Sequence, residues 1–277
     1  MRIDAHQHFW QFDPVRDAWI DDSMQVIRRD FLPADLAPLL EEKGVDGCVA
    51  VQADQSLDET RFLLNLAEEN DWIKAVVGWF DLKAEDLEAQ LDHFLDHKKL
   101  VGARHILEAE PHGFMSSPDF VSGVKKLARR GMTYDILSRE SQLEEVNLLL
   151  HKLPEMKLVV DHMSKPKIKE ASFDHWAKQM IEVAAHDHVT LKLSGLVTEA
   201  DWSNWKKEDF IPYLDFCLDH FGPDRLMYGS DWPVCLLAGS YAQVHDLIQG
   251  YISTLSESEQ AKIMGGTAAQ FYGLSLY

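Results

Sequence analysis

Eight short runs with the composition of β-strands are spaced along this 277-residue chain, and segments with helical patterning lie between them. The runs cover residues 2–6, 47–52, 74–80, 100–107, 132–137, 157–162, 189–194 and 225–230. Strands that alternate with helices are joined by crossover connections, and such connections pair the strands in parallel. This order of elements therefore limits the chain to a small set of α/β folds.

The segments between the runs repeat apolar residues at helical spacing. Residues 57–70 place apolar side chains on one face and acidic side chains on the other. Similar patterns cover residues 85–97, 140–150, 173–185 and 210–220. The pairs Lys43-Gly44 and Arg130-Gly131 would each end a helix just before a strand. These segments are the predicted crossover helices.

Two α/β folds compete for this pattern, a (β/α)8 TIM barrel and a doubly wound open sheet. A barrel of this type typically has about 250 residues, which suits eight units in this chain. No GxGxxG or GxxxxGK[ST] loop follows any predicted strand, and no linker or internal repeat is visible. We predict a single-domain (β/α)8 barrel over residues 1–277, with residues 108–118 as an irregular loop above its mouth.

The charge of the chain excludes some classes of partner. There are 27 Lys and Arg residues against 46 Asp and Glu residues, which gives a net charge of −19. Such a surface repels phosphate backbones and anionic lipid, so we predict neither a nucleic-acid nor a membrane partner. Cys48, Cys217 and Cys235 form no CxxC pair, which indicates a reducing compartment. With no secretion signal visible, we predict a cytoplasmic protein, and a homo-oligomer stays an open alternative.

Polar and titratable residues occur at or near the ends of the predicted strands. In a barrel of this type the catalytic groups lie at the carboxyl ends of the strands. We therefore expect these side chains to meet at one mouth, roughly 10 to 15 Å across. They are His6, His8, Gln52, Arg104, His105, Asp135, Asp161, His162, Lys192, Ser194 and Asp231.

The pair His6-x-His8 is the most informative of these. Residues two apart on a strand point to the same side, so both imidazoles face the same way. Two neutral imidazoles form a chelate for a divalent metal that needs one or two further ligands. Asp231, on the strand that closes the barrel beside the first, could supply an oxygen ligand. Alternatively, Asp231 takes a proton from water while the histidines polarise a carbonyl group.

Four motifs at these strand ends carry a resemblance to a known family. They are HQHFW at 6–10, DHxxKP at 161–166, LSGL at 193–196 and YGSDWP at 228–233. With them the chain resembles the amidohydrolase superfamily, and within it the sugar-lactone hydrolases such as L-fuconolactonases and L-rhamnonolactonases. The stretches 193–202 and 229–239 are most similar to the L-fuconolactonase group, and the resemblance runs along nearly the whole chain.

The resemblance implies a (β/α)8 barrel that opens a lactone ring by adding water. The superfamily pattern has HxH on strand one, Lys or Glu on strand four, histidines on strands five and six, and Asp on strand eight. This chain departs from it, because strand four carries Arg104 and strand five carries Asp135 without a histidine. A binuclear centre with a carboxylated lysine is therefore not expected.

The donors that remain support at most one divalent ion, with zinc as the expected metal. Its ligands would be His6, His8 and Asp231, with His162 nearby. Related lactonases also work without a bound metal, so metal-independent activity stays an alternative.

Ester hydrolysis needs a nucleophilic water, stabilisation of the oxyanion and a proton for the leaving oxygen. We predict Asp231 as the general base, which later returns its proton to the ring oxygen. His6, His8 and His162, or an ion that they hold, would face the carbonyl oxygen. Asp231 and His162 are thus the predicted catalytic residues.

Further residues are predicted to bind the substrate through polar groups or aromatic faces. They are Arg104, Lys192, Gln52, Trp10, Trp79 and Trp232. Each has a structural alternative: Arg104 and Lys192 as members of buried ion pairs, and the tryptophans as packing residues. Asp135 could equally contact substrate or cap a helix.

Three functional hypotheses follow. The first is hydrolysis of a sugar-acid lactone, which would make the chain a carboxylic-ester hydrolase. The second is a metal-dependent decarboxylase or amide hydrolase of the same superfamily, although decarboxylase relatives usually need a further histidine where Asp135 stands. The third is a sugar-acid binding protein without catalysis, against which the intact set of His6, His8, His162 and Asp231 argues.

Overall fold

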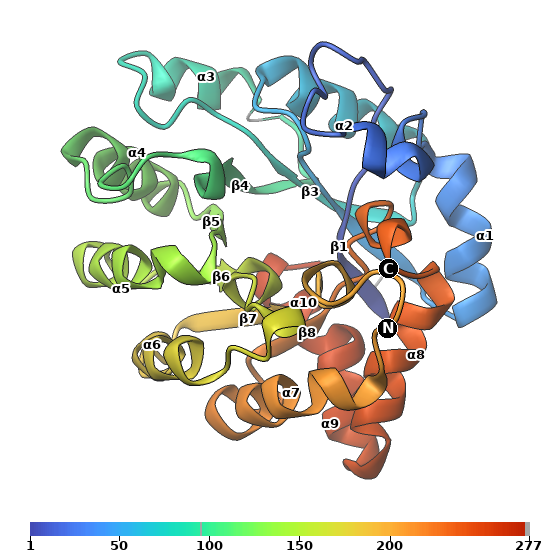
Figure 1. Cartoon of the computed structure of the whole chain (residues 1–277). Coiled ribbons are helices and arrows are strands. Elements are labelled where there is room, and N and C mark those ends of the chain that lie inside the picture. The colour runs from blue at the N-terminus through green and yellow to red at the C-terminus, as the bar shows by residue number, and fades with distance from the viewer. Residues whose placement is uncertain (95, 275–277) are drawn as a thin grey trace.

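The computed structural model describes residues 1–94 and 96–274, and its strands form one parallel sheet in the order β1 to β8. Figure 1 shows the helices arranged around these strands. The strands are β1 (Ile3–Gln7), β2 (Gly47–Val51), β3 (Ile73–Gly78), β4 (Leu100–Ile106), β5 (Thr133–Leu137), β6 (Leu158–Val160), β7 (Val189–Leu193) and β8 (Leu226–Tyr228). The predicted (β/α)8 fold class and all eight strands are confirmed. The extent of the domain, 1–277, stays a prediction because residues 95 and 275–277 lie outside the described residues.

The sheet closes between its first and last strands only beyond the end of β8. Gln7 and Trp232 form an isolated parallel bridge there. The backbone N–H of Asp231 donates to the carbonyl of His6 at 2.8 Å, and that of His8 donates to the carbonyl of Trp232 at 2.7 Å. The hydrogen bonds that close the barrel therefore lie among the residues predicted to bind a metal.

Helices α1 to α7 connect successive strands and surround the barrel, and α8 to α10 follow the last strand (Figure 1). They are α1 (Pro33–Lys43), α2 (Leu57–Glu69), α3 (Leu87–His93), α4 (Pro118–Arg129), α5 (Leu143–Lys152), α6 (Asp174–Ala184), α7 (Lys207–Phe221), α8 (Tyr241–Tyr251), α9 (Glu257–Ala261) and α10 (Thr267–Tyr272). Within the described residues, no helix has both the length and the apolar character needed to cross a membrane.

The helices that lie between strands agree with the sequence patterns, and the helices after β8 are additional. The predicted segments 57–70, 173–185 and 210–220 correspond to α2, α6 and α7, and 140–150 begins with a short 3-10 turn before α5. The predicted segment 85–97 corresponds to the shorter helix α3, and residue 95 of that segment lies outside the described residues. Helices α1 and α4 end at Lys43 and Arg129, at or beside the predicted ends Lys43-Gly44 and Arg130-Gly131, although no start had been predicted for them. Helices α8, α9 and α10, which follow β8, had not been predicted.

The apolar core has two parts. The larger part lies between the sheet and the surrounding helices. The smaller part is made by alternate strand residues, among them Ile3, Val49 and Val77, together with Phe271 and Tyr272 of α10. Side chains two apart on a strand share a face, so this second group belongs to one face of the barrel wall. Helix α10 therefore packs against the same face as these strand residues.

Glu59 of α2 is a buried carboxyl group whose ionisation should oppose folding. It accepts a hydrogen bond from Ala53 N at 3.1 Å, and burial raises its pKa from 4.5 to about 7. Between these two values the folded chain keeps a proton that the unfolded chain releases, so stability falls as the pH rises. In the unaltered chain this effect should lower the free energy of unfolding by up to about 3 kcal/mol as the pH rises, and Glu59→Gln should abolish that decrease.

Urea unfolding at pH 4.5, 6 and 8 measures this effect. The matched control is Glu69→Gln, which changes an exposed carboxyl group at the end of the same helix and should leave the pH dependence as it is. Equal pH dependence in Glu59→Gln and the unaltered chain would contradict the expectation.

Candidate active site

Side chains from three strand ends meet at the carboxyl end of the barrel. His6 is on β1 and His8 directly follows it, His162 follows β6, and Asp231 follows β8. His6 Nε2 lies 3.2 Å from His8 Nε2, and Asp231 Oδ1 lies 3.4 Å from His8 Nε2, 3.9 Å from His6 Nε2 and 3.8 Å from His162 Nε2. All four side chains are buried. The structure thus brings together residues that are up to 225 positions apart in the chain.

The spacing of three of these donor atoms fits a single divalent ion. His6, His8 and Asp231 each offer one ligand atom, and these atoms all lie within 4.8 Å of one another. Donors that each lie about 2.0–2.1 Å from a tetrahedral Zn²⁺ would be about 3.3 Å apart. The observed separations of 3.2, 3.4 and 3.9 Å are close to that value. His162 is the nearest further imidazole to this group.

Hydrogen bonds from the surrounding backbone and side chains orient two of the imidazoles. His8 Nδ1 lies 2.8 Å from the Val51 carbonyl oxygen, to which only a protonated nitrogen can donate, so Nε2 is left as an acceptor or ligand. His162 Nδ1 lies 2.8 Å from Ser194 Oγ. Such outer partners fix ring orientation at metal and catalytic sites. His8 is therefore oriented to present a lone pair to the site.

The backbone at the site is locally strained. His162, Met163, Ser164 and Lys165 have φ values of 52°, 53°, 56° and 49°, and Asp231 has 57°. Left-handed conformations are uncommon for residues other than glycine, and they persist where surrounding contacts enforce them. Both predicted catalytic residues, His162 and Asp231, are in this conformation. The strain is thus located where the side chains must point into the mouth.

Gly195, which follows β7, leaves room for the imidazole of His162. Its φ is +65°, and a Cβ added there would lie 2.7 Å from His162 Nδ1. Ala at this position should push the His162 ring away from Ser194 and lower kcat/KM at least about 10-fold, because a misplaced catalytic group loses much of its effect. Steady-state kinetics of Gly195→Ala measures the loss.

A control separates this clash from backbone strain. Gly131 has a similar φ of +70°, but a Cβ added there meets nothing within 4 Å. Gly131→Ala should therefore lower the free energy of unfolding by about 1 kcal/mol without changing kcat/KM. If both variants lose activity equally, contact with His162 is not the reason for glycine at position 195.

Charged side chains form a closed network beneath the imidazoles. Lys192 Nζ lies 2.6 Å from Asp135 Oδ2, 3.0 Å from Asp161 Oδ1 and 3.2 Å from His6 Nδ1. Arg104 Nη1 lies 3.2 Å from Asp161 Oδ2 and 3.3 Å from His6 Nε2. His6, Asp161 and His162 form a second group with metal-ligand spacing, but each oxygen of Asp161 already faces a cation. This network favours one ion, at His6, His8 and Asp231.

The residues predicted to bind substrate have differing surroundings. Lys192 is buried in the network just described, and Arg104 donates to the backbone and side-chain oxygens of Gln52. The structural alternatives for Arg104 and Lys192 are thus present, and Asp135 pairs with Lys192 instead of capping a helix. Substrate contact by Arg104, Lys192 and Gln52 stays a prediction.

The three tryptophans also differ. Trp10 donates its indole N–H to the Arg29 carbonyl and packs against Phe31, and Trp232 packs against Phe31 as well, so both are buried aromatic packing residues. Trp79 is half-buried, with its ring 6.5 Å from that of His105. Among the three, Trp79 has the most accessible ring for a sugar, and substrate contact by all three stays a prediction.

Burial sets the charge of the site. It lowers the pKa of His6 and His8 and brings that of His162 to about 4, so the imidazoles are neutral near pH 7. Burial acts to raise the pKa of Asp231, but His162 and the hydrogen bond with His8 hold it well below its ordinary range. Neutral imidazoles and an ionised carboxylate are the forms that bind a divalent metal.

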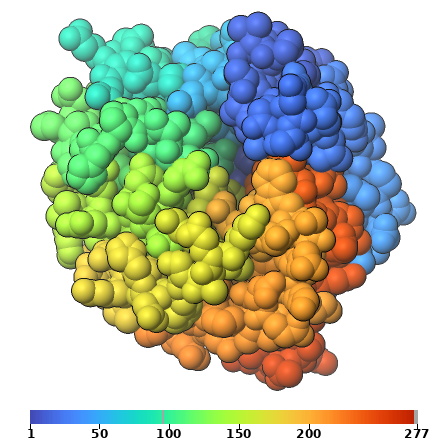
Figure 2. Space-filling model, in the orientation of Figure 1, coloured from blue at the N-terminus to red at the C-terminus, as the bar shows by residue number. Residues whose placement is uncertain are grey.

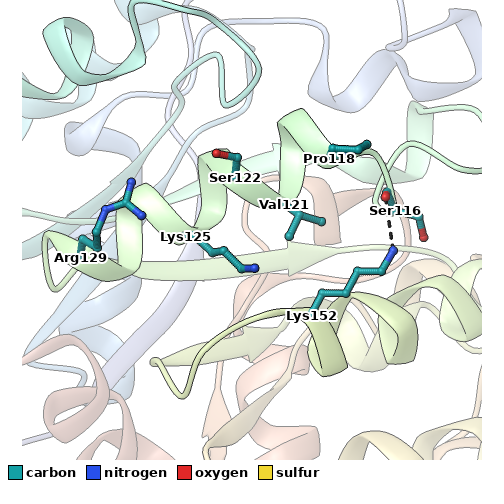
Figure 3. A pocket seen from close by; sticks show the side chains of 7 residues that line it. All are labelled: Ser116, Pro118, Val121, Ser122, Lys125, Arg129 and Lys152. Carbon is teal, nitrogen blue, oxygen red and sulfur yellow. Dashed lines mark hydrogen bonds between the residues drawn. The ribbon is translucent and has the colours of Figure 1, made fainter.

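A separate groove lies on the outside of the barrel between α4 and α5. It has a volume of about 530 Å³. Figure 3 shows the seven side chains that line it, which are Ser116, Pro118, Val121, Ser122, Lys125, Arg129 and Lys152. None of them is a predicted site residue, and Arg129 and Lys152 lie in the last turns of α4 and α5, where cations favour the helix dipole. The strand-end cluster therefore remains the candidate active site.

Fold and site together define a class of protein: a (β/α)8 barrel with a candidate divalent-metal site at the carboxyl ends of its strands. The family model for amidohydrolases matches residues 3–274, and the chain belongs to this family. It is 42% identical over 286 residues to an L-fucono-1,5-lactonase from Burkholderia multivorans, which covers 99% of this chain and 96% of that protein. An L-fucono-1,5-lactonase from Burkholderia ambifaria is 34% identical, with 98% and 95% coverage.

A solved structure of an amidohydrolase from Burkholderia multivorans with bound Zn superposes on this chain with a TM-score of 0.97. It is 42% identical and covers 99% of this chain and 100% of that chain. The family resemblance drawn from the strand-end motifs is thereby confirmed.

The structure also places at the mouth residues that sequence reasoning had not assigned. Glu108, Arg139 and Lys165 form an ion-paired group, and Glu199 stands on the loop after β7. Lys165 was part of the DHxxKP motif, which was its one signal in the sequence. Tyr272 donates to Asp135 Oδ2 at 2.7 Å from α10, and no local pattern marked that contact.

Proposed function

We propose that this chain hydrolyses the lactone of a sugar acid, such as L-fuconolactone or L-rhamnonolactone, and is thus a carboxylic-ester hydrolase. The observation that carries the proposal is the 42% identity over 99% of the chain to an L-fucono-1,5-lactonase. The meeting of His6, His8, His162 and Asp231 supports it, because these groups can activate water and stabilise an oxyanion.

A single divalent ion, with Zn²⁺ the favoured metal, fits the His6, His8 and Asp231 donors. When bound, such an ion polarises a carbonyl oxygen and lowers the pKa of water to about 7. The bound Zn of the Burkholderia multivorans structure supports this choice of metal. His162 would be a further ligand only in the tautomer that leaves Nε2 without a hydrogen, which excludes the catalytic role proposed for it below.

Asp231 is the proposed general base. Its carboxylate is ionised at neutral pH and lies at the mouth, so it can accept the proton of the attacking water. As the tetrahedral intermediate collapses, the protonated carboxyl group returns that proton to the ring oxygen, and the C–O bond of the ester breaks. One residue thus serves both proton transfers that the hydrolysis needs.

His162 is the second proposed catalytic residue. If the Ser194 hydroxyl donates a hydrogen bond to Nδ1, the hydrogen of the neutral imidazole is on Nε2. This Nε2–H points toward the space beside Asp231, where it can donate to the developing oxyanion. Removing one such donor typically costs about 3 to 4 kcal/mol in barrier height.

The position of Asp135 favours hydrolysis over decarboxylation. It lies on β5, where decarboxylase relatives usually carry a histidine. Its carboxylate is ion-paired with Lys192 and accepts a hydrogen bond from Tyr272. A sugar-acid binding protein without catalysis is disfavoured by the identity to curated lactonases.

A pH-indicator assay on a panel of sugar lactones tests the proposal. We expect acid release from L-fuconolactone or L-rhamnonolactone well above the rate of spontaneous hydrolysis. Release from no sugar lactone on the panel would reject it. We further propose a cytoplasmic location, which cell fractionation checks, and size-exclusion chromatography decides whether the chain forms a homo-oligomer.

A further inference from the structure

Three loops at the mouth are joined by charged side chains that the mechanism above does not use. Glu108 follows β4, Arg139 follows β5 and Lys165 follows β6. Lys165 Nζ lies 2.8 Å from each oxygen of Glu108, and Arg139 Nη2 lies 3.4 Å from Glu108 Oε2. The side chains of Glu108 and Lys165 are only 16% and 20% exposed, so this is a mostly buried ion pair and not a solvated surface contact.

Lys165 is tied to the catalytic residue His162 by the backbone. The two residues begin and end the left-handed run 162–165, and Lys165 N donates to the His162 carbonyl at 2.8 Å. Ser164, within the same run, is hydrogen-bonded to Ser138, with the two Oγ atoms 2.9 Å apart. The strain that directs His162 into the mouth therefore also sets the direction of Lys165.

Glu199 lies on the loop after β7, the next strand end along the barrel. It ends a short turn in which Thr198 Oγ1 donates to the Gly195 carbonyl at 2.8 Å, and a Cβ added at Gly195 would lie 2.7 Å from His162 Nδ1. Among the described residues its carboxylate has no hydrogen-bond or ion-pair partner. Burial raises the pKa of Glu199. The charge of Lys165 lowers this pKa, whereas the charges of Glu108 and Asp231 raise it further, so all three charges act on Glu199.

These residues surround the mouth on the side of β4 to β7. Figure 2 shows a hollow on this face, bordered by the segments coloured green to orange that carry them. A carboxylate without a protein partner and a partly exposed ammonium supply an acceptor and a donor to whatever enters. Hydrogen bonds to charged groups are roughly twice as strong as those between neutral groups.

We propose that Lys165, held by Glu108, and Glu199 recognise hydroxyl groups of the lactone substrate and so determine which polyhydroxylated lactone is accepted. This inference rests on the proposed lactonase function and assigns residues to its substrate choice. A site that hydrogen-bonds a substrate hydroxyl rejects the analogue lacking it, because its polar groups are then left unpaired.

The test compares Lys165→Met and Glu199→Gln on a sugar lactone that the unaltered chain hydrolyses and on analogues that each lack one hydroxyl. We expect each variant to lower kcat/KM about 100-fold on the parent lactone. On the analogue that lacks the contacted hydroxyl, variant and unaltered chain should differ less than about 3-fold. This loss of discrimination is a result that a merely structural role would not produce.

The chain offers a matched control on the same loop. Lys167 and Glu170 form an ion pair at 3.9 Å, with side chains 54% and 66% exposed. Lys167→Met and Glu170→Gln make the same chemical changes in solvent and should leave kcat/KM unchanged on every lactone. Calorimetric titration of the ring-opened sugar acid gives a second readout, in which Kd should rise at least about 10-fold in the two mouth variants alone.

Equal losses on the parent and on all analogues, or no loss on the parent, would overturn the inference. Glu199→Gln preserves the size of the side chain, so its result stands even if Lys165→Met does not fold. If the unaltered chain opens no sugar lactone, the proposed function fails, and sugar-acid binding that the mouth variants leave unchanged would then overturn the inference as well.

Discussion

Replacing Asp231 with Asn should lower kcat for sugar-lactone hydrolysis about 10³-fold, within the range that removal of a positioned general base produces. Asn keeps the size of the side chain but accepts no proton from water. It also removes the negative charge that lies 3.4 Å from His8 Nε2 and 3.8 Å from His162 Nε2. The pH-indicator assay measures kcat, and metal analysis of the purified variant shows whether an ion is still held.

The matched control is Asp58→Asn, because that carboxylate is 93% exposed and pairs with Arg61 on the surface of α2. It should leave kcat unchanged. Metal analysis separates loss of the ion from loss of the general base. If Asp231→Asn keeps its ion but has a lower kcat, the loss is that of the general base. Activity within about 10-fold of the unaltered chain would remove Asp231 from this role.

Removing the metal should have the second largest effect. We expect a chelator to lower kcat/KM at least about 100-fold, because the ion supplies several kcal/mol of charge stabilisation. One equivalent of Zn²⁺ per chain should restore activity, because only one of the two donor groups is free to bind an ion. In the second group, both oxygens of Asp161 are paired with Arg104 and Lys192. Metal content and activity are measured on the same samples.

Two histidine variants sharpen this experiment. His8→Ala removes a proposed ligand and should weaken Zn²⁺ binding, whereas His97→Ala changes a surface histidine that pairs with Glu68 and should not. If the chelated chain contains no metal and keeps its full activity, the imidazoles themselves polarise the lactone carbonyl, which is the metal-independent alternative.

Part of the active site was predictable because it depends on local spacing and on a general rule of the fold. The HxH pattern places His6 and His8 on one side of a strand, and the alternation of strands and helices predicts a barrel. A barrel gathers its strand ends at one mouth, so Asp231 at the eighth strand end was expected near the first strand. The observed contacts of 3.4 and 3.9 Å agree with that expectation.

Other features depended on contacts between distant parts of the chain. Lys192 could have been a substrate contact or an ion-pair partner, and the register of the barrel places it between Asp135 and Asp161. Trp10 and Trp232 stood beside polar motifs, yet their rings pack around Phe31, because burial of aromatic surface is a property of the folded layers.

The sequence by itself determined the order of strands and helices, the barrel they form and the strand ends at which chemistry occurs, because hydrophobic period and motif spacing are local properties. The tertiary structure alone decided the left-handed turn that carries His162 and Lys165, and the pairing of Lys165 with Glu108. Residues other than glycine adopt positive φ where contacts made after folding outweigh the local cost, and those contacts come from loops far apart in the chain.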